Sequence, residues 1–195
     1  IHQGTYTLSE TDIYDDLTTS GFQSDLQLNL FAENITLVGL EYQLDKLDTR
    51  KEKTSATPPF FVEKIDPVTT QKAEQSFWSA FVQQQLHLTD ALEANLGARY
   101  YSIDSKLKQS SERATASKSD DQLVGAASLV WQTSDISSLR MNLAQGYTYP
   151  SLTQQFSATA GNSAMNYGNP NLKAEKATTL EMGGRVEGKQ LTLDA

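Results

Sequence analysis

Two alternating segments decide the fold: Leu139-Arg140-Met141-Asn142-Leu143, and Leu180-Glu181-Met182-Gly183-Gly184-Arg185-Val186. In the first, apolar residues occupy every second position and polar residues lie between them. In the second, Leu, Met, Gly and Val share one face, and Glu and Arg lie on the other. Alternation with a period of two is typical of a β-strand, because successive side chains point to opposite faces. The segments therefore predict two strands that face each other across the loop between them.

Prolines mark the ends of that loop. Pro150 fixes its own backbone and offers no ladder donor, so it predicts the end of the first strand. Asn169-Pro170 predicts the point where the loop turns back. On this stretch alone, a long hairpin loop in any antiparallel β protein is the alternative explanation.

The rest of the chain repeats the alternation at regular intervals. It is clear from Phe22, in residues 38–44, and in the predicted strands 75–88, 91–103, 137–148 and 176–187. In residues 123–131 the face is ambiguous, because both alternating sets are apolar. Residues 11–21 are interpreted as a polar loop. Together these runs predict about eight strands, each paired with its neighbour in sequence.

The connections between the predicted strands are sorted by length. Short turns are expected at 32–34, 89–90, 133–136 and 187–190, and they alternate with long loops at 46–74, 104–121 and 149–173. A membrane β-barrel has tight turns on one side of the membrane and long loops on the other. The predicted strand lengths also reach the roughly 9–11 residues that a membrane strand needs. Four hairpins can also show this order by chance.

Aromatic residues gather near the long loops, where an interfacial girdle is expected. They are Phe77 and Trp78, Tyr100 and Tyr101, and Tyr147 and Tyr149. The alternative explanation is ordinary strand composition, because aromatic residues favour strands in any protein.

Charges of both signs occupy the polar face of the predicted strands. Such a face suits a wide barrel with a wet or plugged lumen, as in outer-membrane transporters of about 22 strands. The alternative is the solvent face of a soluble sheet. The residues concerned are Glu41, Asp45, Glu93, Arg99, Arg140, Glu181 and Arg185.

Composition excludes several classes of protein. A net charge of −8 argues against a nucleic-acid partner, which requires a basic surface. There is no cysteine, so disulfides and thiolate chemistry are excluded. Of the two histidines, His2 and His87, neither lies in a catalytic motif, so no enzyme, catalytic residue or metal site is predicted. No run of about 20 apolar residues predicts a transmembrane helix.

Three motifs carry a resemblance to a known family. In order they are Gly146-Tyr147-Thr148-Tyr149-Pro150-Ser151-Leu152, then Asn169-Pro170-Asn171-Leu172-Lys173-Ala174-Glu175, then the segment that begins at Leu180. This order resembles the C-terminal barrel half of TonB-dependent outer-membrane receptors. The resemblance implies an all-β, antiparallel up-and-down meander within a large transmembrane β-barrel. Residues 1–195 would form a partial barrel, without plug domain, TonB box or C-terminal strands.

The resemblance also implies a function. The parent protein would lie in the outer membrane of a Gram-negative bacterium and take up a ferric siderophore or similar iron chelate. Its partners would be the chelate, membrane lipid, and TonB through the plug region. Tyr147, Tyr149 and Tyr167 are the expected ligand-binding residues, and no resident cofactor is expected. Haem is disfavoured because no histidine lies between Tyr147 and Leu172.

Two further classes are open at this point. One is a soluble β-sandwich adhesin or carbohydrate-binding module. The other is an outer-membrane barrel enzyme, which lacks a credible base. A piece of barrel also has two unpaired sheet edges, which are costly in lipid. The last segment, 191–195, is too short to span, so we expect the edges to pair with a second copy or within an intact parent, not with each other.

Overall fold

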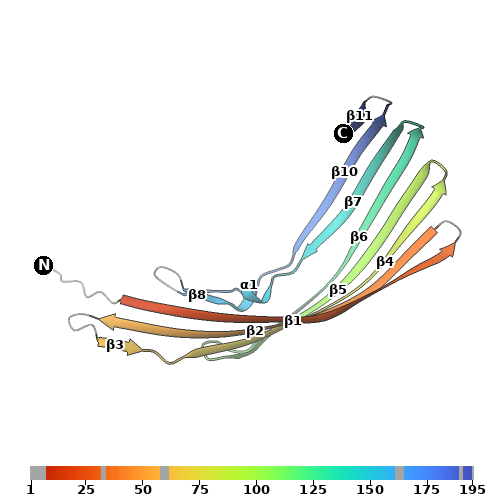
Figure 1. The fold of residues 1–195 in the computed structure, drawn as a ribbon. Helices are drawn as coiled ribbons and strands as arrows, with labels where there is room; N and C mark the ends of the chain where they lie inside the picture. The colour runs from red at the N-terminus through yellow and green to blue at the C-terminus, as the bar shows by residue number, and fades with distance from the viewer. Residues whose placement is uncertain (1–7, 32–33, 58–61, 161–164, 189–190, 195) are drawn as a thin grey trace.

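The computed structural model describes residues 8–31, 34–57, 62–160, 165–188 and 191–194. One large antiparallel sheet dominates, with strand order β1-β2-β4-β5-β6-β7-β10-β11. Strand β3 pairs with β2, and β8 and β9 form a separate two-stranded sheet. Figure 1 shows the large sheet as a curved wall. The predicted all-β, antiparallel up-and-down meander is confirmed.

The elements have the following bounds. The strands of the large sheet are β1 (Leu8–Phe31), β2 (Asn34–Thr57), β3 (Val62–Ile65), β4 (Thr69–Thr89), β5 (Leu92–Ser110), β6 (Ala116–Ser134), β7 (Ser137–Thr148), β10 (Glu175–Glu187) and β11 (Thr192–Asp194). Between β7 and β10 lie α1 (Leu152–Phe156), β8 (Ala158–Ala160) and β9 (Met165–Tyr167). In the part of the chain that the structure describes, no helix has the length and apolar character needed to cross a membrane.

Several strands are longer than predicted. The predicted polar loop at 11–21 is wrong, because these residues belong to β1 and pair with β2 from Thr11↔Lys53 to Gly21↔Gln43. The predicted loops at 46–74 and 104–121 are also mostly strand. In these extensions polar residues occupy both faces, as at Asp15, which faces inward, and Asp16, which faces outward. The backbone ladder therefore continues where the hydrophobic alternation has stopped.

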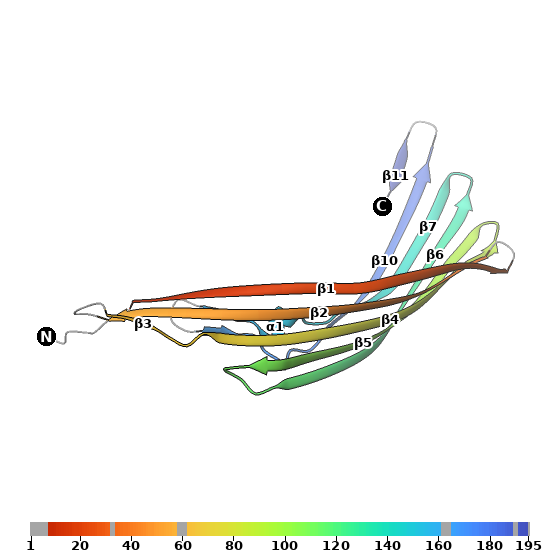
Figure 2. The same cartoon turned by 60° about the horizontal axis from the view of Figure 1, so that its bottom comes forward.

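The predicted alternation of short and long connections is confirmed only in part, because two of the three predicted long loops are mostly strand and the predicted turns at 32–34 and 187–190 fall partly outside the described residues. Strands β2 and β4, β5 and β6, and β7 and β10 are joined at one end of the sheet, which we call the loop end. Strands β1 and β2, β4 and β5, β6 and β7, and β10 and β11 are joined at the other, the turn end (Figures 1 and 2). The loop end thus collects the segments in which the chain has most freedom to build a site.

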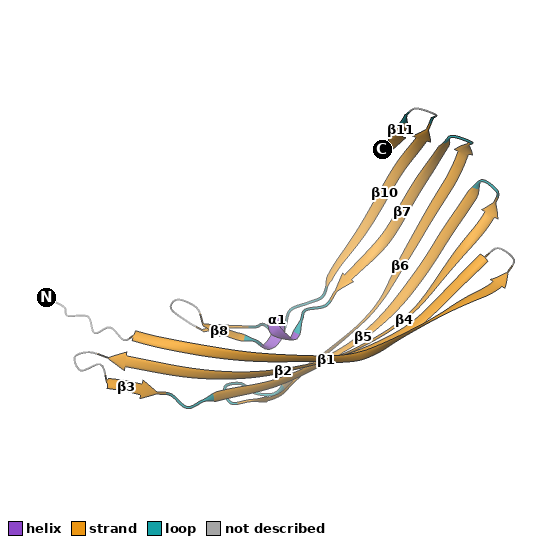
Figure 3. Cartoon of the chain, in the orientation of Figure 1, coloured by secondary structure: helices purple, strands orange, loops and turns teal. Residues whose placement is uncertain are grey.

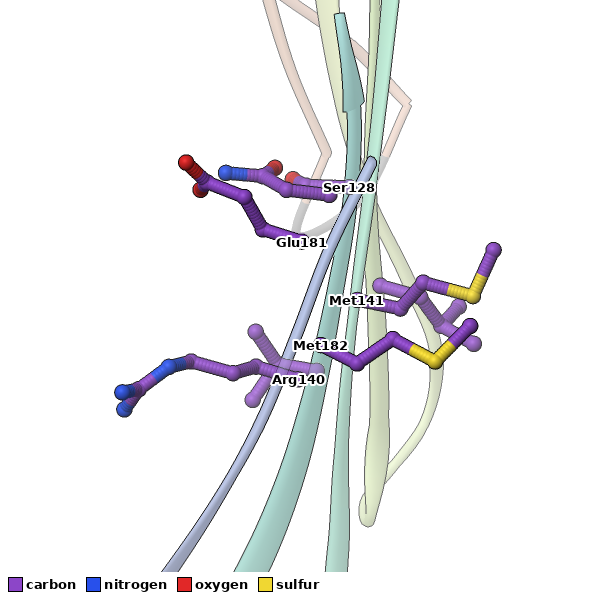
Figure 4. A pocket seen from close by; sticks show the side chains of 8 residues that line it. Ser128, Arg140, Met141, Glu181 and Met182 are labelled. Carbon is purple, nitrogen blue, oxygen red and sulfur yellow. The ribbon is translucent and has the colours of Figure 1, made fainter. Parts of the chain in front are cut away.

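The curvature gives the sheet a concave and a convex face. Helix α1 lies on the concave face, where Leu152 and Phe156 pack against Leu47, Ala73 and Leu107 in a small buried core. Leu47 faces the concave side. The strand register and the alternation of side chains then assign each of the remaining strand residues to one of the two faces. They place Arg140 and Glu181 on the concave face and Met141 and Met182 on the convex one, and Figure 4 shows these two pairs on opposite sides of the strands.

The convex face carries most of the exposed apolar residues. They include Leu26, Leu40, Leu96, Leu123, Leu139 and Leu180. The ambiguity in 123–131 is resolved, because Leu123 pairs with Tyr100 and faces out, while Val124 pairs with Arg99 and faces in. An apolar outer surface of this extent is typical of an interaction or lipid-facing surface, not of a monomer in water. A β-sandwich would instead bury its apolar face against a second sheet.

Candidate ligand-binding site

Helix α1 carries the connection 149–174 onto the concave face, as Figure 3 shows. Its start is fixed by a capping box. The Ser151 Oγ accepts from the Gln154 backbone N–H at 3.3 Å, and Gln154 Oε1 accepts from the Ser151 N–H at 2.9 Å. Leu152 and Phe156 then point into the small core. A five-residue helix has little stability of its own, so its position depends on this cap and this core.

Buried amides hold α1 to the sheet. Gln155 Nε2 donates to the Pro150 carbonyl at 2.7 Å and to Ser105 Oγ at 3.3 Å. Gln75 Nε2, from β4, donates to the same two acceptors at 3.1 and 2.8 Å. Gln71 Nε2 donates to the Phe156 carbonyl. Ser105 is fully buried and joins β4, β5 and the helix.

Gly168 closes the connection against α1. Its N–H donates to the Ser157 carbonyl at 2.7 Å, and the Asn169 N–H donates to the Gln154 carbonyl at 3.0 Å. A Cβ at position 168 would lie 2.7 Å from the Gln154 carbonyl oxygen, and from two other backbone atoms of the helix. Backbone atoms cannot move aside as a side chain can. The Gly168-Asn169-Pro170 motif therefore requires glycine because of this close approach.

An aromatic row runs along the concave face near α1. The Phe77 and Tyr101 ring centroids are 5.7 Å apart, and the Tyr101 and Tyr147 centroids are 5.2 Å apart with planes inclined at 30°. The Arg99 guanidinium lies 4.8 Å from the Phe81 centroid and 5.7 Å from that of Tyr101. These separations are favourable for aromatic and cation–π contacts.

Arg99 is also paired across the sheet. Its Nη2 lies 3.5 Å from Glu41 Oε2, and Ser79 Oγ donates to the same carboxylate oxygen at 3.2 Å. The pair holds the guanidinium over the rings, where a cation and π surfaces are presented together to the interior.

Tyr149 lies beyond the end of β7, near the Lys118 ammonium at 6.0 Å from the ring centroid. Burial raises the pKa of Tyr149, and the carboxylates of Asp120 and Asp104 raise it further. The phenol is therefore neutral at physiological pH. Its buried hydroxyl, like that of Tyr147, has no hydrogen-bond partner among the described residues.

Tyr167, at the end of β9, lies between two cations. The Arg113 guanidinium is 4.3 Å from its ring centroid, and the Lys51 ammonium is 5.4 Å away. Lys51 forms an ion pair with Glu112. Tyr167 remains 49% exposed, so one part of its surface is open to a ligand.

The three predicted tyrosines therefore fall into two groups at the loop end. Tyr147 and Tyr149 lie near the aromatic row, whereas Tyr167 contacts Arg113 and Lys51. The sequence pattern predicted neither the cations beside Tyr167 nor the contacts of Ser105 and Gln155. The Ser151 to Gln154 capping spacing is a signal that α1 begins there, but nothing local indicates its partners on β4 and β5.

The predicted girdle is only partly correct. Trp78 forms a convex cluster with Phe22 and Tyr42, with centroids 4.3 to 6.0 Å apart. Phe77, Tyr101 and Tyr147 instead lie on the concave face. Adjacent strand residues point to opposite faces, so only one member of each consecutive pair is available to a girdle.

Among the described residues, no three His, Cys, Asp or Glu side chains lie together in a way that would hold a metal ion. The described residues instead place aromatic rings beside charged groups of both signs on the concave face near the loop end. This composition suits recognition of a large molecule by stacking and by charge.

An up-and-down wall with an apolar outer face, a polar inner face and long connections at one end defines a membrane β-barrel protein. The sequence model described as "TonB dependent receptor-like, beta-barrel" matches residues 2–195. The chain belongs to this TonB-dependent receptor β-barrel family. The family assignment and the single large sheet favour a barrel of this family over the soluble β-sandwich, which was open on the sequence pattern alone.

Solved structures share the fold. The ferric-catecholate import receptor Fiu from Escherichia coli K12 is 14% identical, with a TM-score of 0.56 over 90% of this chain and 29% of Fiu. The copper transporter OprC is 16% identical, with a TM-score of 0.52 over 80% of this chain and 28% of OprC. The ferric citrate transporter FecA, unliganded, is 14% identical, with a TM-score of 0.50 over 95% of this chain and 27% of FecA. The chain thus spans less than a third of these receptors. No curated protein matches it.

Proposed function

We propose that the parent receptor takes up a ferric siderophore or a similar iron chelate across the outer membrane of a Gram-negative bacterium. In this proposal residues 1–195 are part of the barrel, and the plug that reaches TonB lies elsewhere in the parent. The coverage of less than a third of Fiu, OprC and FecA supports this division. The convex apolar face contacts lipid.

One observation carries the proposal: aromatic rings and cations share the concave face near the loop end. The row of Phe77, Tyr101 and Tyr147 offers π surfaces, and Arg99 and Lys118 add positive charge beside it. Iron chelates are large, often aromatic and often acidic, so stacking and charge attraction act together on them. Tyr147, Tyr149 and Tyr167 are the residues proposed to contact the chelate.

The fold relatives bind more than one kind of cargo by their names: ferric catecholate, ferric citrate and copper. We favour an iron chelate because the concave face presents rings and cations, which suit an organic ligand. The role of this segment is binding and passage, with no catalysis.

The sheet edges belong to the same proposal. Strands β1 and β11 lie at opposite edges of the described sheet and do not pair with each other. We propose that in the parent barrel they pair with further strands. The 195-residue chain alone would expose these edges and pair with a second copy, which sedimentation in detergent would detect as a dimer or larger species.

The direct test uses the full-length parent receptor in detergent. Tryptophan fluorescence is followed during titration with ferric citrate, a ferric tricatecholate, the trihydroxamate ferrioxamine B, and copper(II). Saturable binding of at least one ferric chelate, and iron-limited growth that depends on the receptor, are expected. Binding of copper alone, or of none of the four, contradicts the proposal.

A further inference from the structure

Arg113, one of the two cations beside Tyr167, has a hydrogen-bond donor without an acceptor in the described part of the chain. Arg113 Nη1 donates to the Gly168 carbonyl at 3.3 Å, but Arg113 Nη2 is buried without a hydrogen-bond partner among the described residues. A buried, charged donor without an acceptor is unfavourable, and native proteins rarely leave one. The unpaired Arg113 Nη2 therefore indicates a position that lacks a hydrogen-bond acceptor.

We propose that Arg113, Lys51 and Tyr167 form a subsite for an anionic oxygen group, such as a carboxylate or catecholate, of the transported chelate. The inference rests on the proposed function and assigns its ligand class: the chelate is anionic, not neutral or cationic. Tyr167 serves as the platform, and Arg113 supplies the directional donor.

The local charge supports this assignment. Lys51 has only 7% of its side chain exposed and is paired with Glu112, whose side chain is 30% exposed. Counting formal charges, the two cations and one carboxylate leave a net charge of +1. Asp15 lies in the next row of the same face, where it accepts from Thr49 Oγ1 at 2.6 Å and keeps its own negative charge, so the excess of +1 belongs to the groups in direct contact with Tyr167 and Lys51. An incoming anion would neutralise the excess charge in a place with little water, where charge attraction is strong.

The guanidinium also fits the geometry of the group it would bind. Its planar nitrogens match carboxylate and catecholate oxygens, and its Cζ lies 4.3 Å from the Tyr167 ring centroid. Lys51 reaches the same ring at 5.4 Å. The ring and the two cations are thus close together before the ligand arrives, which lowers the ordering cost of binding, although the buried Nη2 must become accessible to the ligand.

The experiment compares four versions of the full-length receptor in detergent: wild type, Arg113→Gln, Arg113→Lys and Lys72→Gln. Lys72 is an exposed cation on the convex face, paired with Asp48, so it controls for the loss of one positive charge. Far-UV circular dichroism and heat-modifiable migration on gels confirm that each is folded. The probes are ferric citrate, a ferric tricatecholate and cationic ferrioxamine B, at low and high salt.

We expect Arg113→Gln to weaken binding of the two anionic chelates roughly 10- to 100-fold, the range for a lost hydrogen bond to a charged group. Arg113→Lys should keep part of the affinity, and Lys72→Gln all of it. The wild-type preference for anionic chelates should shrink at high salt.

Two results overturn the inference while leaving the proposed function standing: ferrioxamine B binding as tightly as the anionic chelates, or Arg113→Gln weakening all ferric chelates equally. If no ferric chelate binds, the proposed function fails. In that case, titration with iron-free citrate tests the subsite separately from the proposed function. Arg113→Gln must still weaken whatever citrate binding the wild type shows. Absence of any citrate binding would contradict the subsite as well.

Discussion

Tyr101 and Tyr147 stack with ring centroids 5.2 Å apart, although strict alternation assigns them to opposite faces of the sheet. Tyr101 faces inward, whereas Tyr147 continues the series of Leu139, Met141 and Leu143, which face outward. The ladder between β6 and β7 ends at Ala126↔Ala144, and the Gly125 N–H then donates to Gln145 Oε1 at 3.1 Å. Freed from β6, the end of β7 carries Tyr147 over to Tyr101.

Replacing Tyr147 tests whether this stack holds the site together. Tyr147→Phe keeps the ring and removes a buried hydroxyl without a described partner, so stability and chelate binding should be unchanged or slightly improved. Tyr147→Ala should cost about 0.5–1.5 kcal/mol from the lost ring pair alone, and should weaken binding. Urea unfolding and chelate titration of the full-length receptor measure both. Equal effects of the two changes would show that the ring contact is not what matters.

The strands 137–148 and 176–187 are predictable nearly to the residue, because apolar residues or glycine occupy every outward position from Leu139 to Leu143 and from Leu180 to Val186. Residues 11–21 are not, since Asp12 and Asp16 face outward and remove the pattern while the backbone ladder persists. The contacts of the site on the concave face are still harder to predict from the sequence. The contact from Gln71 to Phe156 joins residues 85 positions apart, and no local rule indicates it.

Gly168→Ala should release the connection 149–174 from the concave face. The new Cβ would lie 2.7 Å from backbone atoms of α1, so the two segments must separate. Hydrogen exchange of the full-length receptor should show faster exchange in residues 151–157, with the strands unaffected. Gly146→Ala is the matched control, because its Cβ would meet only Ala177 Cβ at 3.7 Å. Unchanged exchange in the Gly168 variant would contradict the close packing.

Ser105→Ala should loosen the same segment by a different route. Removing the hydroxyl deprives the Gln75 and Gln155 amides of a shared acceptor, although both keep the Pro150 carbonyl. We expect a loss of about 1 kcal/mol, seen as faster exchange in α1. Ser119→Ala, at an exposed position, should have no effect. If both variants exchange alike, Ser105 does not hold the helix.

Phe156→Ala tests whether packing, and not the polar contacts, dominates the position of α1. The side chain is 1% exposed against Leu47, Ala73 and Leu107. Its loss should cost about 3–5 kcal/mol, enough to open the connection locally. Limited proteolysis should then cleave within 149–174 while the strands stay protected. Thr153→Ala, exposed on the same helix, should remain resistant.

Lysine substitutions at adjacent positions of β7 test the assignment of the two faces to lipid and lumen. Met141 faces outward beside Met182 (Figure 4). Asn142 pairs with Glu181 and shares its inward face. Each change adds one positive charge, so net charge is matched. Met141→Lys places that charge in hydrocarbon and should lower the stability of the full-length receptor in phospholipid vesicles by about 2–4 kcal/mol. Asn142→Lys should be nearly neutral, because a wet lumen and the facing carboxylate accommodate the ammonium. Urea titration of folding into vesicles measures the difference, and equal stabilities for the two variants would contradict the outer-membrane assignment.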